Sequence, residues 1–350
     1  MSDEMTRTTS QPSLPTAATD GAATPVAVLQ VPLPSRTVRL RLKLEAANRY
    51  GSVKARTAQA LLDSLVAQGA LRPGGHVVES TSGNLGIALA GLCRERGYRC
   101  TLMVDATTPA YSLARMIELG AELVTVDTPD PIHQVHARID AVHTFQLHHP
   151  DAVWTDQYGN PAGPAAHAAT TGPELLGPAA LGPPDAVAVP VSTGGTLAGV
   201  IAHLRRHAPT VQVVAVDAVG STAIGGPLRP RPRKLPGFGS GLVSQLLRPD
   251  DCDRVIHVTD DDAAHTCRII RARTGLSLGG SAGATVTAAT RLALDDPTIS
   301  DVACLCPDGG DRYQNTIYAT TGPTPTTSDT DAISALYNAA LPQGTIFHEP

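Results

Sequence analysis

Aromatic residues are scarce in this chain: Phe, Trp and Tyr together make up 3% of its 350 residues. We therefore expect a core built mainly from Ala, Val, Leu and Ile. Hydrophobic residues make up 42% of the chain and charged residues 17%, proportions typical of a soluble globular protein. The length exceeds that of one ordinary core and suits two α/β lobes.

The chain also lacks a basic surplus, a long apolar run and closely spaced cysteines. Its formal net charge of -5 argues against a nucleic-acid partner. No apolar run approaches the roughly 20 residues of a membrane span, so a membrane partner is not expected. The 6 cysteines form no CxxC motif, so we expect no zinc, redox or other metal site. Reduced thiols fit a cytoplasmic protein.

The two ends of the chain differ in composition from its middle. Residues 1–25 are rich in Ser, Thr, Ala and Pro and lack the basic start and apolar segment of a secretory signal, so we expect a disordered extension. Residues 321–350 begin with a run of Thr, Pro and Ser, which predicts a C-terminal tail. Within that tail, a short helix over residues 333–341 is expected to dock on the core.

Strand-like and helix-like patterns alternate through the middle of the chain. The strands are expected at residues 39–44, 76–79, 100–104, 122–126, 152–155, 186–191, 211–217 and 301–306. The helices are expected at residues 52–68, 85–96, 112–119, 131–144, 165–176, 197–207, 259–274 and 282–294. This alternation predicts an α/β fold with parallel sheets and helices on both faces. Residues 225–241 are dense in Pro, Gly and Arg and are expected to form a functional loop.

The most informative segment is ESTSGNLGIALA, residues 79–90. It leads from a predicted strand into a predicted helix through Ser80, Thr81, Ser82 and Asn84. Loops at the carboxyl ends of parallel strands are where ligands bind, and helix N-termini present free N–H groups to anions. One such residue would be an ordinary helix cap. Four together with two glycines favour a small-molecule site.

Lys54 is the residue best suited to covalent chemistry. It lies in NRYGSVKARTAQ, where Gly51 and Ser52 mark a helix start and place the lysine in the first turn. The helix dipole disfavours a cation at that end. An exposed surface lysine is the ordinary alternative, and a Schiff-base lysine is the functional one, because its amine reacts more readily when its charge is disfavoured.

Two further loops precede helices and have small side chains. The first consists of Ser192, Thr193, Gly194, Gly195 and Thr196. Its backbone N–H groups are suited to a phosphate, with a plain tight turn as the alternative. The second contains Ser281 in LGGSAGAT, which is either a helix cap or a hydroxyl that faces a cofactor ring nitrogen. Gln157 and Tyr158 lie in a turn-rich linker between the expected lobes, and clefts between domains are common ligand sites.

The order GSVK, TSGNLG, DQYGN, STGGT, GGSAG resembles the fold type II pyridoxal phosphate enzymes, which include cysteine synthase and cystathionine β-synthase. The resemblance covers about residues 42–318. It implies a tryptophan synthase β-like fold in which residues 45–160 form a smaller substrate-carboxylate lobe. Residues 26–44 and 161–320 would form a larger phosphate lobe, and the protein would be a homodimer.

The resemblance also implies roles for individual residues. Lys54 would be the catalytic residue and would bind pyridoxal 5'-phosphate covalently, Asn84 would bond the ring hydroxyl, and Ser281 would face the ring nitrogen. The cofactor phosphate would be held by Ser192, Thr193, Gly194, Gly195 and Thr196. The amino-acid substrates would be bound by Ser80, Thr81, Ser82, Asn84, Arg138, Gln157, Tyr158 and Ser192. Arg138 is expected to meet a leaving phosphate or an incoming carboxylate, with a surface arginine as the alternative.

Finer features point to one branch of this family. Cysteine synthases usually read TSGNT and GTGGT, whereas this chain reads TSGNL, with Leu85, and STGGT. These strings, with LPGFGSG and PDGGDRY, are most similar to N-(2-amino-2-carboxyethyl)-L-glutamate synthases. That similarity implies β-replacement of the phosphate of O-phospho-L-serine by L-glutamate, a step toward L-2,3-diaminopropionate for siderophores or peptide natural products. A cysteine synthase and a non-catalytic partner protein on this fold remain as alternatives.

The chain departs from the family pattern at several positions. Family members usually have Asp where Ala55 follows the lysine. Phe238 and the Gly-Ser-Gly that follows it replace residues of a loop expected to close over the substrate. The identity of the second substrate, which replaces the phosphate of phosphoserine, therefore depends on positions that the motifs do not define.

Overall fold

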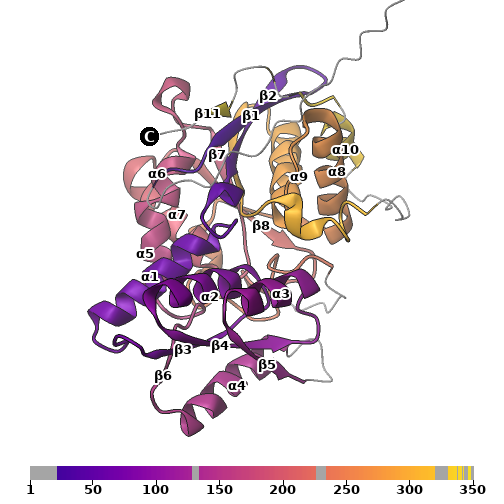
Figure 1. Cartoon of the computed structure of the whole chain (residues 1–350). Helices are drawn as coiled ribbons and strands as arrows, with labels where there is room; N and C mark the ends of the chain where they lie inside the picture. The colour runs from indigo at the N-terminus through magenta and orange to yellow at the C-terminus, as the bar shows by residue number, and fades with distance from the viewer. Residues whose placement is uncertain are drawn as a thin grey trace, which may run out of the picture.

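The computed structural model describes residues 22–127, 134–225, 234–319, 330–336, 338–340, 342 and 346–347. Two separate sheets lie one above the other, each with helices on both faces (Figure 1). The fold is α/β, as the alternating pattern predicts. None of the described helices has the length and apolar character needed to span a bilayer.

The smaller sheet has four parallel strands in the order β5-β4-β3-β6. The strands are β3 (His76–Ser80), β4 (Arg99–Asp105), β5 (Glu122–Val126) and β6 (Ala152–Trp154). One face is covered by α1 (Lys54–Ala67), α2 (Asn84–Arg96) and α3 (Ala110–Glu118), and the other by α4 (Gln134–His148) (Figure 1). Apolar side chains of α1 and α2 form one core with this sheet, and Val142 of α4 packs in a second core on the opposite face.

The larger sheet has seven strands in the order β11-β1-β2-β10-β7-β8-β9. They are β1 (Val26–Pro32), β2 (Thr37–Leu44), β7 (Ala186–Pro190), β8 (Gln212–Ala218), β9 (Arg254–Val258), β10 (Asp301–Cys306) and β11 (Ile346–Phe347). Strand β1 is antiparallel to both of its neighbours, and the other pairs are parallel. The carboxyl ends of β7 and β10 therefore lie at the same edge, where ligands bind in open α/β sheets.

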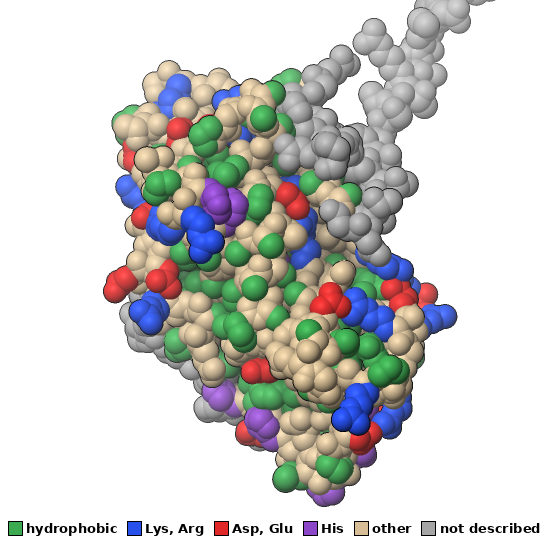
Figure 2. Space-filling model, turned by 90° about the vertical axis from the view of Figure 1, so that its left-hand side faces the viewer, with side chains coloured by type: hydrophobic (Ala, Val, Ile, Leu, Met, Phe, Trp, Pro, Cys, Tyr) green, Lys and Arg blue, Asp and Glu red, His purple; other side chains and the backbone are tan. Residues whose placement is uncertain are grey.

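Two groups of helices cover the larger sheet. One face carries α8 (Asp260–Thr274), α9 (Gly280–Asp295) and α10 (Thr330–Leu336), and the other carries α5 (Ala162–Ala169), α6 (Thr171–Leu175) and α7 (Gly195–His207) (Figure 1). A short 3₁₀ turn, Gly310–Tyr313, follows β10. Figure 2 shows the side of the molecule on which α5 lies. Its middle is mainly uncharged, and charged side chains gather toward its edges.

Most elements match the sequence prediction within a few residues, and the differences have local causes. The helix expected over residues 165–176 is two helices that meet at Thr170. Pro173 has no N–H to donate to the turn before it, which explains the break there. Strands β1, β9 and β11 were not predicted: β9 and β11 are short edge strands, whereas β1 is an inner strand whose apolar run, VAVLQVP, directly follows the segment expected to be disordered.

Part of the C-terminal segment returns to the larger sheet. Ile333 and Leu336 of α10 are buried in its core, so a helix docks there as expected, although it spans Thr330–Leu336 and not residues 333–341. Ile346 of β11 pairs with Ala27 of β1. Residues 1–21, residues 226–233 of the Pro- and Gly-rich loop, and residues 320–329 lie outside the described residues.

Candidate functional site

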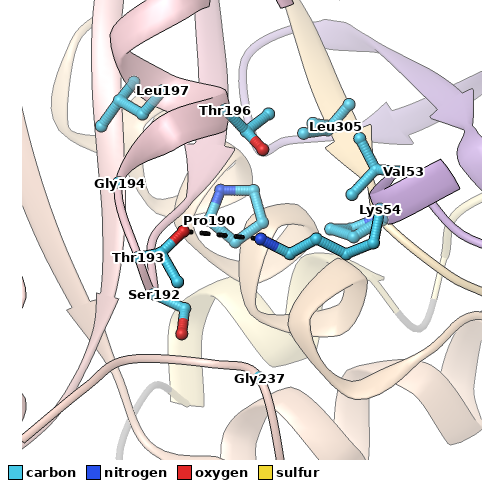
Figure 3. A pocket seen from close by; sticks show the side chains of 11 residues that line it. Val53, Lys54, Pro190, Ser192, Thr193, Gly194, Thr196, Leu197, Gly237 and Leu305 are labelled. Atoms are coloured by element: carbon cyan, nitrogen blue, oxygen red, sulfur yellow. Dashed lines mark hydrogen bonds between the residues drawn. The ribbon is translucent and has the colours of Figure 1, made fainter. Parts of the chain in front are cut away.

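Lys54 and the 192–196 loop line one cavity between the two sheets (Figure 3). Lys54 is the first residue of α1, and its Nζ lies 3.5 Å from Oγ1 of Thr193. The cavity is lined by Val53, Lys54, Pro190, Ser192, Thr193, Gly194, Thr196, Leu197, Gly237, Leu305 and Pro307. The structure therefore brings together the predicted reactive amine and the predicted phosphate loop.

The loop at residues 192–196 takes its shape from a glycine and from a hydroxyl outside the loop. Gly194 has φ +91°, and a Cβ there would lie 2.1 Å from Oγ of Ser244, so only glycine fits. The Ser244 hydroxyl donates to the Thr193 carbonyl at 2.8 Å, which turns that acceptor away from an anion. Helix α7 begins at Gly195, and the first N–H groups of a helix have no intrahelical partner. This arrangement suits a phosphate group.

The loop after β3 is shaped by one of its own hydroxyls. Oγ1 of Thr81 accepts hydrogen bonds from the backbone N–H of Gly83 at 3.3 Å and of Gly86 at 3.1 Å. Ser82 and Asn84 stay half-buried at the start of α2. Leu85 is only 2% exposed and packs in the core of the smaller sheet. Leucine here, where cysteine synthases usually have threonine, therefore changes the packing of α2. It adds no apolar contact to a substrate in the cavity.

A buried carboxylate that sequence reasoning missed lies behind this loop. Glu79 accepts hydrogen bonds from the Trp154 ring N–H at 3.0 Å, the Thr155 hydroxyl at 2.5 Å, and the backbone N–H groups of Ser80 at 2.7 Å and Gln157 at 3.1 Å. Burial nevertheless raises its pKa to about 7. The available signal was an acidic residue at the end of an otherwise buried strand.

Arg138, from α4, is buried behind the same loop and is no surface arginine. The side chain is 4% exposed, forms an ion pair with Asp105, and places its Nε 3.3 Å from the Ser80 hydroxyl. The Gln157 amide donates to the Ser80 carbonyl at 2.7 Å. Burial raises the pKa of Tyr158, and the nearby Arg138 opposes that shift. Ser80, Arg138, Gln157 and Tyr158 thus form one polar cluster.

Asp308, in the PDGGDRY string, contacts Asn84 and also Gly279, which lies two residues before Ser281. Ser281 is the second residue of α9, is 7% exposed, and follows Gly279, which touches Asp308. The Asn84 side-chain amide donates to Oδ2 of Asp308 at 2.8 Å. Asp308 follows Pro307, which lines the cavity. The two predicted ring-binding residues therefore lie at the β10 side of the cavity.

A neutral histidine supports the lysine helix and the phosphate loop together. His167 Nε2 lies 2.9 Å from the Thr57 hydroxyl and 3.3 Å from the Thr196 hydroxyl, and Nδ1 lies 2.8 Å from the Thr171 hydroxyl. Burial, together with the positive charges of Lys54 and Arg56, lowers the pKa of His167 to about 3. The ring is therefore uncharged at physiological pH and links three hydroxyls.

The environment of Lys54 makes its amine reactive near neutral pH. Burial lowers its pKa from 10.5 to about 8, and the negative charge of Glu79 opposes that shift. About a tenth of the amine is then neutral at pH 7. Among the described residues, no three His, Cys, Asp or Glu side chains are grouped as metal ligands.

This pKa predicts how fast the apoprotein binds pyridoxal phosphate covalently. The rate should rise about tenfold per pH unit and level off near pH 8, because only the neutral amine attacks the aldehyde. Stopped-flow absorbance of the lysine-bound cofactor measures it, with a free lysine amide as the reference. Glu79→Gln should move the midpoint lower, because it removes a charge that holds the proton. A midpoint near that of free lysine would contradict this description of Lys54.

Comparison with known proteins agrees with this geometry. Residues 19–308 match the protein family described as "Pyridoxal-phosphate dependent enzyme". The chain belongs to this family of pyridoxal-phosphate dependent enzymes. The match covers the smaller sheet, every strand of the larger sheet except β11, and all five motifs, which confirms the expected fold type and cofactor class.

Two curated relatives of this chain share one name with each other. The N-(2-amino-2-carboxyethyl)-L-glutamate synthase of Ralstonia nicotianae is 40% identical over 84% of this chain and 87% of its own length. The protein of that name from Cupriavidus metallidurans is 39% identical over 79% of this chain and 81% of its own. The subfamily resemblance seen in the motifs therefore extends over most of the chain.

Solved structures share the fold. The crystal structure of O-ureido-L-serine synthase aligns with a TM-score of 0.78 and 29% identity over 88% of this chain and 96% of its own. The hydrogen sulfide-producing enzyme of Fusobacterium nucleatum aligns with a TM-score of 0.84 and 22% identity over 94% of this chain and 96% of its own, a likeness of fold alone.

The residues of the cavity fit the cofactor of this family. The cavity offers an amine from Lys54 and a phosphate cradle from the 192–196 loop, and Asp308, which binds the Asn84 amide, directly follows the lining residue Pro307. In the part of the chain that the structure describes, two buried polar atoms nearby have no hydrogen-bond partner: Oγ of Ser52 and Oδ1 of Asp308. Such orphaned atoms point to a missing polar ligand.

Proposed function

We propose that the protein joins O-phospho-L-serine to L-glutamate, releasing phosphate and forming N-(2-amino-2-carboxyethyl)-L-glutamate. The observation that carries the proposal is the shared cavity of Lys54 and the 192–196 loop, in a chain 40% identical to a synthase of that name. The product would be a precursor of L-2,3-diaminopropionate.

When bound, pyridoxal phosphate withdraws electrons from the α-carbon of an amino-acid substrate. Lys54 Nζ is the base that removes the α-proton of phosphoserine, since its lowered pKa leaves part of the amine neutral. The Cβ–O bond breaks and phosphate leaves. The glutamate amine then forms a bond to Cβ and loses a proton, while Lys54 returns a proton to Cα.

The substrate groups have matching partners around this amine. The N-terminus of α2 and the hydroxyls of Thr81 and Ser82 receive the substrate carboxylate, with Gln157 at the side. Arg138 is tied to Ser80 and already paired with Asp105, so its proposed contact with the phosphate or a glutamate carboxylate requires it to serve two anions at once. Tyr158 and Ser192 complete the acceptor side, and Ser192 stands where cysteine synthases usually have glycine.

We also propose that the enzyme is a cytoplasmic homodimer whose lobes close over the substrates. The smaller lobe would be residues 45–160, and the larger lobe residues 26–44 and 161–320, each holding one of the two sheets. Closure would keep water from the reactive species between elimination and addition. Light scattering at micromolar protein concentration tests the dimer.

Release of inorganic phosphate tests donor and acceptor together. The holoprotein should release phosphate from O-phospho-L-serine faster when L-glutamate is present, and replacing the donor with O-acetyl-L-serine should slow turnover by about tenfold or more, since the phosphate's charge-assisted hydrogen bonds are lost. Sulfide serves as the competing acceptor. Turnover with sulfide but none with glutamate would favour the alternative, a cysteine synthase. A protein that shows no visible absorbance with pyridoxal phosphate would favour a non-catalytic partner protein.

A further inference from the structure

Asn84 is held from two sides by residues of the turn that follows β10. Asp308 and Arg312 belong to the larger sheet's side of the molecule, whereas Asn84 begins α2 above the smaller sheet. Oδ2 of Asp308 accepts from Nδ2 of Asn84 at 2.8 Å. A guanidinium nitrogen of Arg312 donates to Oδ1 of Asn84. The two contacts meet opposite ends of one side-chain amide.

These contacts allow only one orientation of the amide. An arginine only donates hydrogen bonds, so it must face the amide oxygen, and an ionised carboxylate only accepts, so it must face the nitrogen. A 180° flip of Asn84 would set donor against donor and acceptor against acceptor. In the orientation that remains, Nδ2 has one uncommitted hydrogen, while its oxygen is shared with a cation. Nδ2 of Asn84 can therefore donate one further hydrogen bond.

Both holding residues are themselves anchored. The Tyr313 hydroxyl donates to Oδ2 of Asp308 at 3.1 Å, and Arg312 donates to the Tyr50 carbonyl at 2.6 Å. A Cβ at Gly279 would lie 1.8 Å from Oδ1 of Asp308. Any larger residue at position 279 would therefore clash with this carboxylate. The arrangement is rigid without any cofactor contact.

We propose that Asp308 and Arg312 are positioning residues that hold Asn84 as a hydrogen-bond donor toward the ring oxygen of pyridoxal phosphate and so select the ionised form of that oxygen. The proposal deepens the cofactor assignment of this site and rests on it. A donated hydrogen bond stabilises an anionic oxygen more than a neutral hydroxyl, because hydrogen bonds to charged groups are the stronger ones. The unpartnered Oδ1 of Asp308 lies at the same side of the cavity.

Cofactor affinity of the apoprotein tests this without any amino-acid substrate. Wild type and variants are titrated with pyridoxal phosphate and with 3-deoxypyridoxal phosphate, which lacks the ring oxygen. Wild type should prefer pyridoxal phosphate by about tenfold, the effect of one hydrogen bond to an ionised group. Asn84→Ala should remove that preference. Arg312→Gln should reduce the preference in part, because glutamine both donates and accepts, so that only Asp308 then opposes the flipped amide.

Arg312→Lys is the matched control, since lysine only donates and should retain the preference. If Arg312→Gln does not fold, Asp308→Ala replaces it with the same expected loss. An unchanged preference in these variants, or an equal loss of affinity for both compounds, would overturn the positioning role. Failure of wild type to bind either compound would overturn the cofactor assignment as well. Failure of glutamate as the acceptor would leave the measured preference unchanged.

Discussion

Replacing Lys54 with alanine should abolish the visible absorbance of the bound cofactor and reduce turnover by about 10³-fold or more. The variant loses the amine that holds the aldehyde and the base that moves the α-proton, and no other described lysine lines the cavity. Absorbance spectra and phosphate release from O-phospho-L-serine measure the two losses. The fold should survive, because the hydrogen bond that Lys54 Nζ makes within the described residues, to Thr193 at 3.5 Å, is a long one.

Lys234→Ala provides the control, because that lysine is exposed and pairs with Asp261 at 2.8 Å on the surface. It should keep the spectrum and turnover of wild type. Normal turnover in the Lys54 variant, with an unchanged unfolding transition, would contradict the assignment of this residue.

The second large effect is expected at Arg56, two residues after the lysine. Its guanidinium contacts Glu45 at 2.9 Å and Glu174 at 2.6 Å, and Lys43 contacts Glu174 at 2.7 Å. These side chains are mostly buried, so Arg56→Met leaves two carboxylates without their main partner. The free energy of unfolding should fall by about 3 kcal/mol or more, as it does when a buried ion pair loses one member. Urea unfolding of the apoprotein measures it.

Arg205→Met is the matched comparison for Arg56. Arg205 pairs with Asp253 at 2.8 Å, but the two side chains are 36% and 41% exposed. Removing an exposed pair should cost less than about 1 kcal/mol. Because Arg56 ties the start of α1 to the larger sheet, its variant should also bind pyridoxal phosphate more weakly, whereas the Arg205 variant should not. Equal losses of stability in the two variants would contradict the role of the buried network.

The sequence predicted the parts of this protein that depend on local pattern. Lys54 and the 192–196 loop could be found because a helix start and a glycine-rich loop are visible in consecutive residues, and the structure brings them to one cavity. The alternation of strands and helices likewise predicted the parallel sheets. Leu85 was recognised as unusual, but its burial in the core required the packing of α2.

What the sequence did not reveal depends on contacts between distant residues. Glu79, His167 and Asp308 each act through partners that lie many positions away, such as Thr155 for Glu79 and Asn84 for Asp308. Glu79 and Asp308 lie in the quoted strings ESTSGNLGIALA and PDGGDRY, but neither string reveals these partners. The short strand β9, with alternate residues exposed, gave no continuous apolar run to detect.

Product identity tests the central claim most directly. The holoprotein is incubated with O-phospho-L-serine and ¹⁵N-labelled L-glutamate, and the products are separated and analysed by mass spectrometry. We predict one labelled product whose mass is that of the two substrates less phosphoric acid, formed in equal amount with inorganic phosphate. Phosphate release without any labelled adduct, or an adduct formed only when sulfide is supplied, would contradict the proposed function.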